Sequence, residues 1–150
     1  MRYASIRKLD ISNGEGVGIS LFVQGCPFHC YNCFNQETWD FNGGFEWTED
    51  IKEYFLDLAD HPYIGRISIL GGEPLCNENA PDVLELIKDI RERYGDSKKI
   101  WVYTGNVIES IDINLLTNID VLVDGRYIDD ERDLNLAFRG SANQRIIRLR

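Results

Sequence analysis

Short apolar runs alternate with amphipathic stretches along most of this chain. The apolar runs at residues 18–23, 66–70, 99–103 and 119–123 have the length and β-branched content of buried strands. Two stretches between them repeat apolar residues every three to four positions, the spacing of one helix face. Strands that alternate with helices predict βαβ units and a parallel sheet.

Local start and stop signals support the two predicted helices. The first begins after Thr48, whose side chain can accept a hydrogen bond from the first helical turn. The second has Pro81 in its first turn and Gly95 as its stop signal. A weaker helical pattern covers residues 107–116, and the apolar pair at residues 146–147 fits a last strand.

A motif of small or polar residues directly follows each predicted strand. In chain order these motifs occupy residues 26–33, 71–74, 103–105 and 124–127. The carboxyl ends of parallel strands share one edge of the sheet, where ligands gather. Because the chain is too short for an eight-stranded barrel of about 250 residues, we predict an α/β fold: a curved parallel sheet of about four to five strands forming a partial (β/α) barrel.

Composition narrows the class of protein. A length of 150 residues suffices for one domain with its own core, so we predict a single domain over residues 1–150. The net charge of −9 argues against nucleic acid as a partner, because phosphate binding needs clustered Lys and Arg. No apolar run approaches the ~18 residues of a membrane span, and the first residues lack a signal core. The expected location is the cytoplasm, without a membrane partner.

Three of the four cysteines are crowded into one short loop. Cys26, Cys30 and Cys33 form a C-x3-C-x2-C array, and cytoplasmic thiols stay reduced and available as ligands. A [4Fe–4S] cluster usually has four cysteine ligands, so three leave one iron open, and an open metal position binds a substrate or cofactor. A structural zinc site completed by Cys76 or His29 is the alternative, although zinc modules favour paired C-x2-C units. Cys76 is a candidate fourth cluster ligand, but a buried thiol is the commoner role.

The turn after the second predicted strand contains Gly71, Gly72 and Glu73. Two glycines let the backbone approach a ligand closely, and free backbone N–H or C=O groups of such a turn can meet a carboxylate or an ammonium group. Most Gly-Gly pairs are simply turns. The position of this pair, after a strand in a chain with the cysteine array, makes it a candidate site.

Polar residues after the third and fourth strands are further candidates. Thr104 can reach a polar group of a ligand bound at this edge, with a plain turn as the alternative. Asp124 and Arg126 are candidates for a substrate-facing rim, with a solvated ion pair as the alternative. No acid–base pair stands out, so no catalytic residue is predicted beyond the cluster and a cofactor.

The cysteine array, with Tyr31 before its last pair, resembles the signature of the radical S-adenosylmethionine (SAM) superfamily. The resemblance implies that the open iron binds the amino and carboxylate groups of SAM, and that an electron from the cluster splits SAM to methionine and a 5′-deoxyadenosyl radical. It also implies that the Gly-Gly-Glu turn binds the SAM amino group and that the aromatic segment packs on adenine. The predicted cofactor-binding residues are Tyr31, Asn32, Cys33, Phe34, Gly71, Gly72, Glu73 and Thr104.

Several segments narrow the resemblance to the activating proteins of anaerobic ribonucleoside-triphosphate reductases. They are residues 10–16, 25–39, 71–75, 124–127 and 139–145, and the last, Arg-Gly-Ser-x-Asn-Gln-Arg, is the most specific family mark. The resemblance implies an enzyme, a glycyl-radical activase, whose substrate is a glycine of the large reductase subunit. It further implies a reducing electron donor such as flavodoxin or ferredoxin, and self-association into a homodimer.

Three alternatives keep parts of this interpretation. The chain can activate a different glycyl-radical enzyme, or act on a small molecule as the 7-carboxy-7-deazaguanine synthases do, although the tail motif argues against both. It can instead be a non-enzymatic iron–sulfur or zinc binding module. A fourth protein ligand would mark such a module, and Cys76 is the candidate.

Overall fold

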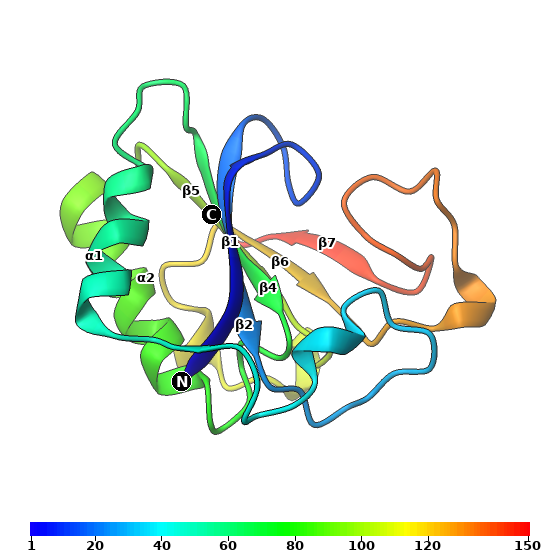
Figure 1. The fold of residues 1–150 in the computed structure, drawn as a ribbon. Coiled ribbons are helices and arrows are strands. Elements are labelled where there is room, and N and C mark those ends of the chain that lie inside the picture. The colour runs from blue at the N-terminus through cyan, green and yellow to red at the C-terminus, as the bar shows by residue number, and fades with distance from the viewer.

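The computed structural model describes residues 1–150 and contains one seven-stranded mixed sheet with two α-helices (Figure 1). The strand order is β3-β1-β2-β4-β5-β6-β7, in which the central four strands are parallel and the outer three are antiparallel to their neighbours. The strands are β1 (Arg2–Asp10), β2 (Gly18–Gln24), β3 (Phe45–Glu46), β4 (Arg66–Gly71), β5 (Lys99–Tyr103), β6 (Val121–Asp124) and β7 (Arg145–Arg148). The helices are α1 (Glu49–Leu58) and α2 (Ala80–Tyr94).

The predicted helix signals are confirmed. The Thr48 hydroxyl accepts a hydrogen bond from the Ile51 N–H at 3.3 Å and caps α1. Pro81 lies in the first turn of α2, and Gly95 ends that helix with a positive φ of 58°. Neither helix is long and apolar enough to cross a membrane.

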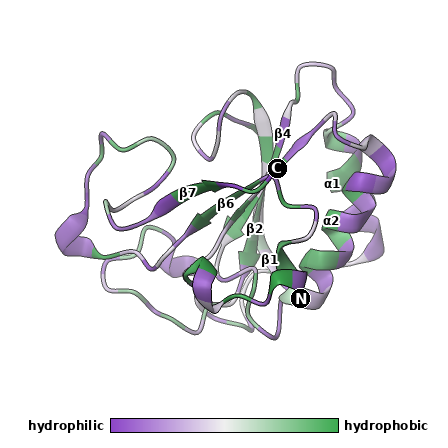
Figure 2. Ribbon diagram, turned by 180° about the vertical axis from the view of Figure 1, so that it is seen from behind, coloured by the Kyte–Doolittle hydropathy of each residue, from purple (hydrophilic) through white to green (hydrophobic).

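Both helices cover the same face of the sheet, and the main core lies between the two layers. Side chains alternate along each strand, so every second residue of the parallel strands points toward the helices, as Ile19, Ile67 and Ile100 do. Phe55 of α1 and Leu86 of α2 are fully buried against them. In Figure 2 the helices are hydrophobic on the side that faces the sheet and hydrophilic on the outer side.

Loops rather than helices cover the opposite face of the sheet. A small apolar cluster of Trp101, Val121 and Val123 lies there and is covered partly by Phe138. In Figure 1 the loop after β2 and the long segment between β6 and β7 extend on the side away from α1 and α2. This is the face of the sheet that carries the candidate site.

The prediction of a partial (β/α) barrel of radical SAM type, built on a parallel sheet of about four to five strands, is wrong. The sheet has seven strands in mixed orientation, and only two α-helices accompany it. The predicted helix at residues 107–116 is absent, because that stretch forms two short 3₁₀ turns, Ile108–Ser110 and Ile113–Leu116. The connection from β5 to β6 therefore adds no helix to a surrounding layer.

The strand β1 was missed because its sequence does not read as a buried strand. It carries several charged residues, and only Asp10 is buried. It pairs with β2 and β3, and only Tyr3 and Ile6 of its side chains pack against the main core, so it has no apolar run of its own. The guanidinium of Arg7 lies 4.8 Å from the centre of the Phe22 ring and so covers an apolar side chain of the neighbouring strand.

Candidate functional site

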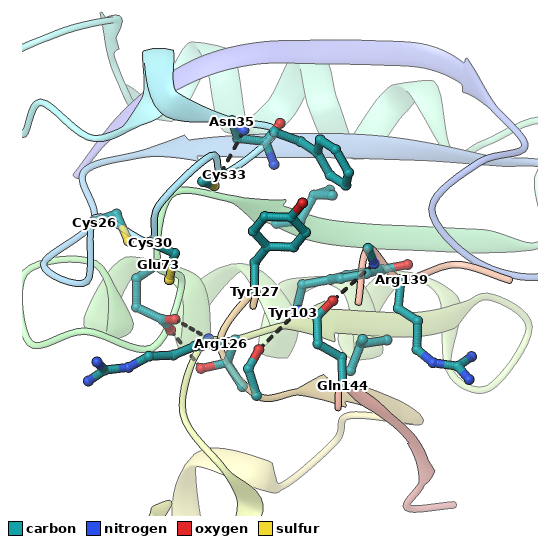
Figure 3. Close-up of a pocket in the computed structure, with 18 of the residues that line it drawn as sticks. Cys26, Cys30, Cys33, Asn35, Glu73, Tyr103, Arg126, Tyr127, Arg139 and Gln144 are labelled. Atoms are coloured by element: carbon teal, nitrogen blue, oxygen red, sulfur yellow. Dashed lines mark hydrogen bonds between the residues drawn. The ribbon is translucent and has the colours of Figure 1, made fainter. Parts of the chain in front are cut away.

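The loops on the helix-free face enclose a cavity of about 310 Å³, within the range of small-molecule sites. Its walls come from the loops that follow all four parallel strands, as the sequence predicted for their shared carboxyl edge. Figure 3 shows the cysteines and Glu73 toward one end, and Arg139 and Gln144 toward the other. The wall includes Cys26, Cys30 and Cys33 after β2, Gly71, Gly72 and Glu73 after β4, Thr104 and Gly105 after β5, and Gly125, Arg126 and Tyr127 after β6.

Backbone hydrogen bonds hold the start of the cysteine loop in place. The Gly25 N–H donates to the Thr38 carbonyl at 2.6 Å, and the Cys26 N–H donates to the Trp39 carbonyl at 3.1 Å. The His29 ring stacks on Trp39, with 4.7 Å between the ring centres. His29 therefore supports the loop and does not line the cavity.

The three thiols of the loop are half-buried and form no disulfide. Burial raises the pKa of Cys26 and of Cys30, so both prefer the thiol form until a metal displaces the proton. No three His, Cys, Asp or Glu side chains converge closely enough to hold one metal ion. A single zinc ion, with Zn–S bonds of about 2.3 Å, would need such convergence, whereas a four-iron cube spans more widely separated sulfurs.

Cys76 lies apart from this group. Its side chain is 9% exposed, and it is absent from the cavity wall that the other three cysteines share. Burial raises the pKa of Cys76 to about 11, which keeps it a neutral thiol. Its surroundings are those of a small buried side chain beside the first turn of α2.

Glu73 is a buried carboxylate that ties two loops together. It is 1% exposed, and its oxygens accept hydrogen bonds from the Leu75 N–H at 2.8 Å, the Gly105 N–H at 2.6 Å and the Thr104 hydroxyl at 2.8 Å. Burial raises the pKa of Glu73, and these three hydrogen bonds oppose the rise. With three donors already bound, the carboxylate has little capacity left for a ligand.

The two glycines before Glu73 let neighbouring backbones touch. Gly71 has a φ of +105°, a region that glycine adopts readily. A side chain at Gly72 would collide with the backbone of Gly25. The Glu73 N–H donates to the Gly25 carbonyl at 2.8 Å, which joins this turn to the cysteine loop. On the side where a Cβ would stand, Gly72 thus lies in close contact with protein backbone.

We expect Thr104→Val to lower the free energy of unfolding by about 1.5–3 kcal/mol, because it removes one hydrogen bond to a buried carboxylate. Thr104 is itself buried, and its hydroxyl also accepts from the Asn106 N–H at 3.1 Å. Denaturant unfolding measures the effect. Thr104→Ser keeps the hydroxyl and is the matched control; equal stability of the two variants would contradict this role.

Of the predicted cofactor-binding residues at positions 31, 32 and 34, only Phe34 lines the cavity. Phe34 lines the cavity and packs against the Tyr127 ring, with 5.0 Å between the ring centres. Tyr31 is 77% exposed, and Asn32 donates to the Asp129 carboxylate at 3.1 Å. Neither Tyr31 nor Asn32 reaches the cavity wall.

Of the two residues predicted for the substrate-facing rim, Arg126 lines the cavity and Asp124 does not. Arg126 lines the cavity, with its guanidinium 4.3 Å from the centre of the Phe28 ring in the cysteine loop. Burial raises the pKa of Cys30, and the positive charge of Arg126 opposes part of that rise. Asp124 is fully buried and pairs with Arg145 at 2.6 Å, so it does not face the cavity.

Sequence reasoning missed several other residues of the wall. Phe138, Arg139 and Gln144 come from the segment between β6 and β7, and Tyr103, at the end of β5, belongs to a predicted strand-end motif but was given no role. Arg139 and Gln144 belong to the motif at residues 139–145, the most specific family mark, so the sequence did point to this segment. The motif alone does not tell which of its side chains face inward, because that depends on long-range packing.

Comparisons with known proteins agree with the iron–sulfur cluster predicted for the cysteine loop. A family described as a 4Fe-4S single cluster domain matches residues 12–147. The chain is also similar over its full length to proteins named anaerobic ribonucleoside-triphosphate reductase-activating protein. Identity is 37% with that of Escherichia coli (strain K12), with 100% of both chains covered. It is 38% with that of Vibrio cholerae (99% and 98% covered) and 33% with that of enterobacteria phage T4 (97% and 93% covered).

Proposed function

Because this chain belongs to the family of anaerobic ribonucleoside-triphosphate reductase-activating proteins, we propose that it activates such a reductase by generating a radical on one of its glycines. The observation that carries the proposal is the cavity whose wall brings three cysteine thiols and the Gly-Gly-Glu turn together. The activity is that of a radical SAM oxidoreductase with a protein substrate.

Cys26, Cys30 and Cys33 are the proposed ligands of the [4Fe–4S] cluster. Three half-buried thiols on one wall, free of disulfides, fit a cube that is held on one side and open on the other. Cys76, outside that wall, supplies no fourth ligand in this proposal. When bound, the reduced cluster and SAM supply an organic radical strong enough to remove one hydrogen atom from a glycine.

The chain's own residues orient the cofactor and exclude water. Backbone groups of Gly71 and Gly72 are the proposed partners of the SAM amino group, and Glu73 positions them through its bonds to neighbouring loops. Phe34 and Thr104 complete the proposed cofactor wall. Tyr31 and Asn32 are left out, because neither reaches the cavity.

Two further partners belong to the proposal through the family resemblance alone. The cluster needs one electron for each turnover, for which a flavodoxin or ferredoxin is the proposed donor. Two copies of the chain are proposed to form a homodimer. Size-exclusion chromatography with light scattering tests the dimer independently of the chemistry.

Electron paramagnetic resonance of the anaerobically reconstituted, reduced protein tests this function. We expect a [4Fe–4S] signal whose spectrum changes when SAM is added, because the open iron takes the cofactor. Addition of the large reductase subunit is expected to give a glycyl radical signal, and an unrelated glycyl-radical enzyme is the control. If the spectrum of the cluster does not change when SAM is added, the protein is an electron carrier or a structural module instead.

A further inference from the structure

Two residues of the cavity wall, Tyr103 and Arg139, carry buried hydrogen-bond donors without partners. The Tyr103 hydroxyl and the Arg139 Nε are buried and have no hydrogen-bond partner in the protein, and both residues line the cavity. Arg139 uses only Nη1 locally, in a bond of 3.2 Å to the Ala137 carbonyl. It forms no ion pair, although the chain has more acidic than basic residues. Buried donors of this kind are costly unless a ligand or water binds them.

Packing on both sides fixes the turn that holds Arg139. Phe138 has a positive φ of 60°, which is unusual for a residue with a side chain and recurs at functional sites. Its ring packs edge-on against Trp101 of the sheet, with 5.6 Å between the centres. Gly140 follows, where a side chain would press into the rings of Phe34 and Tyr127. The turn is thus held between the sheet and the cysteine loop.

The side-chain acceptor of Gln144, next to this turn, is already in use. The Gln144 Oε1 accepts from the N–H groups of Gly140 and Ser141 at 2.9 and 3.1 Å, and its amide nitrogen donates to the Gly125 carbonyl at 3.0 Å. Glu73, the one acidic residue in the cavity wall, lies toward the cysteine end. A ligand beside Tyr103 and Arg139 therefore meets two donors without partners, and acceptor groups on the ligand would satisfy them.

The Tyr103 hydroxyl is suited to donating. Burial raises the pKa of Tyr103, so the phenol keeps its proton across the physiological range. The guanidinium of Arg139 has no acceptor at all. A group that only accepts hydrogen bonds matches these two donors better than a sugar hydroxyl, which both donates and accepts.

A glycine substrate presents such groups. Glycine has no side chain, so an enzyme that must hold one glycine in position can use only the backbone of that segment and its neighbours. We propose that Tyr103 and Arg139 form a subsite that binds backbone carbonyl oxygens of the reductase segment carrying the target glycine. This inference rests on the proposed function and adds two residues that bind the substrate segment.

The ratio of 5′-deoxyadenosine formed to glycyl radical formed tests the subsite. If Arg139 positions the glycine, Arg139→Gln leaves the SAM-dependent change of the cluster spectrum unaltered and raises this ratio, because cofactor cleavage becomes uncoupled from the substrate. Loss of a charge-assisted bond to the peptide is also expected to raise the KM for the reductase about tenfold or more. Tyr103→Phe removes only the hydroxyl, and its effect is expected in the same direction but smaller.

Arg132→Gln is the matched control. Arg132 lies on the same segment with its guanidinium 5.3 Å from the centre of the Phe34 ring, but it is exposed and does not line the cavity. If Arg139→Gln and Tyr103→Phe both match this control in ratio and KM, the subsite is refuted. If either variant instead needs more SAM for the spectral change, the donors serve the cofactor and the inference is wrong. A wild-type protein that forms no glycyl radical would overturn the proposed function itself.

Discussion

Alanine in place of Cys30 is expected to leave the reconstituted protein almost without cluster iron and sulfide. In our proposal three cysteines hold the cluster, and no further protein ligand is present. Without Cys30, only two thiolates would remain on the cavity wall to bind iron. No neighbouring cysteine can replace the lost one, because Cys76 lies outside that wall. Iron and sulfide assays, with the visible absorbance of the cluster, measure the loss.

Cys76→Ala is the control for this experiment. It removes a buried thiol and is expected to keep a full cluster, at a cost in stability of about 1 kcal/mol for the lost packing. If cluster content falls as far as it does for Cys30→Ala, Cys76 is a fourth ligand, and the open iron on which the SAM proposal depends does not exist. If both variants keep their iron, the array itself is not the cluster site.

Features set by neighbours in sequence were predictable. The cap at Thr48 and the stop at Gly95 depend on the residues within one helical turn, and both occur as expected. The convergence of the cysteines with Glu73 followed from chain order, because motifs after successive parallel strands meet at one edge. Such inferences need no knowledge of which side chains pack together.

Features set by distant contacts were not predictable in the same way. The sequence could not show that the charged strand β1 would pair with β2 and β3, or that loops would cover the second face of the sheet. Asp124 looked like an exposed rim residue, yet it is buried and pairs with Arg145, 21 positions later in the chain. The partner of each group lies too far along the chain for any local pattern to identify it.

Gly72→Ala is expected to affect both stability and cluster assembly. A Cβ at this position would press into the backbone of Gly25, 3.0 Å from its nitrogen and closer to its carbonyl. Backbone atoms cannot rotate away as a flexible side chain would, so the cysteine loop and the Gly-Gly-Glu turn must move apart. Overpacking of this kind costs about 1–3 kcal/mol, and the shift strains the bond from the Glu73 N–H to the Gly25 carbonyl.

The same change at Gly65 separates this steric effect from the general consequence of replacing a glycine. An added Cβ at Gly65 meets nothing within 4 Å, so Gly65→Ala is expected to change the free energy of unfolding by less than about 0.5 kcal/mol. Denaturant unfolding and cluster content are measured for both variants. If Gly72→Ala assembles as much cluster as Gly65→Ala, contact between the two loops is not what positions the cysteines. A selective loss of cluster in Gly72→Ala would mean that the close contact between the two backbones, which only glycine allows here, positions the cysteines.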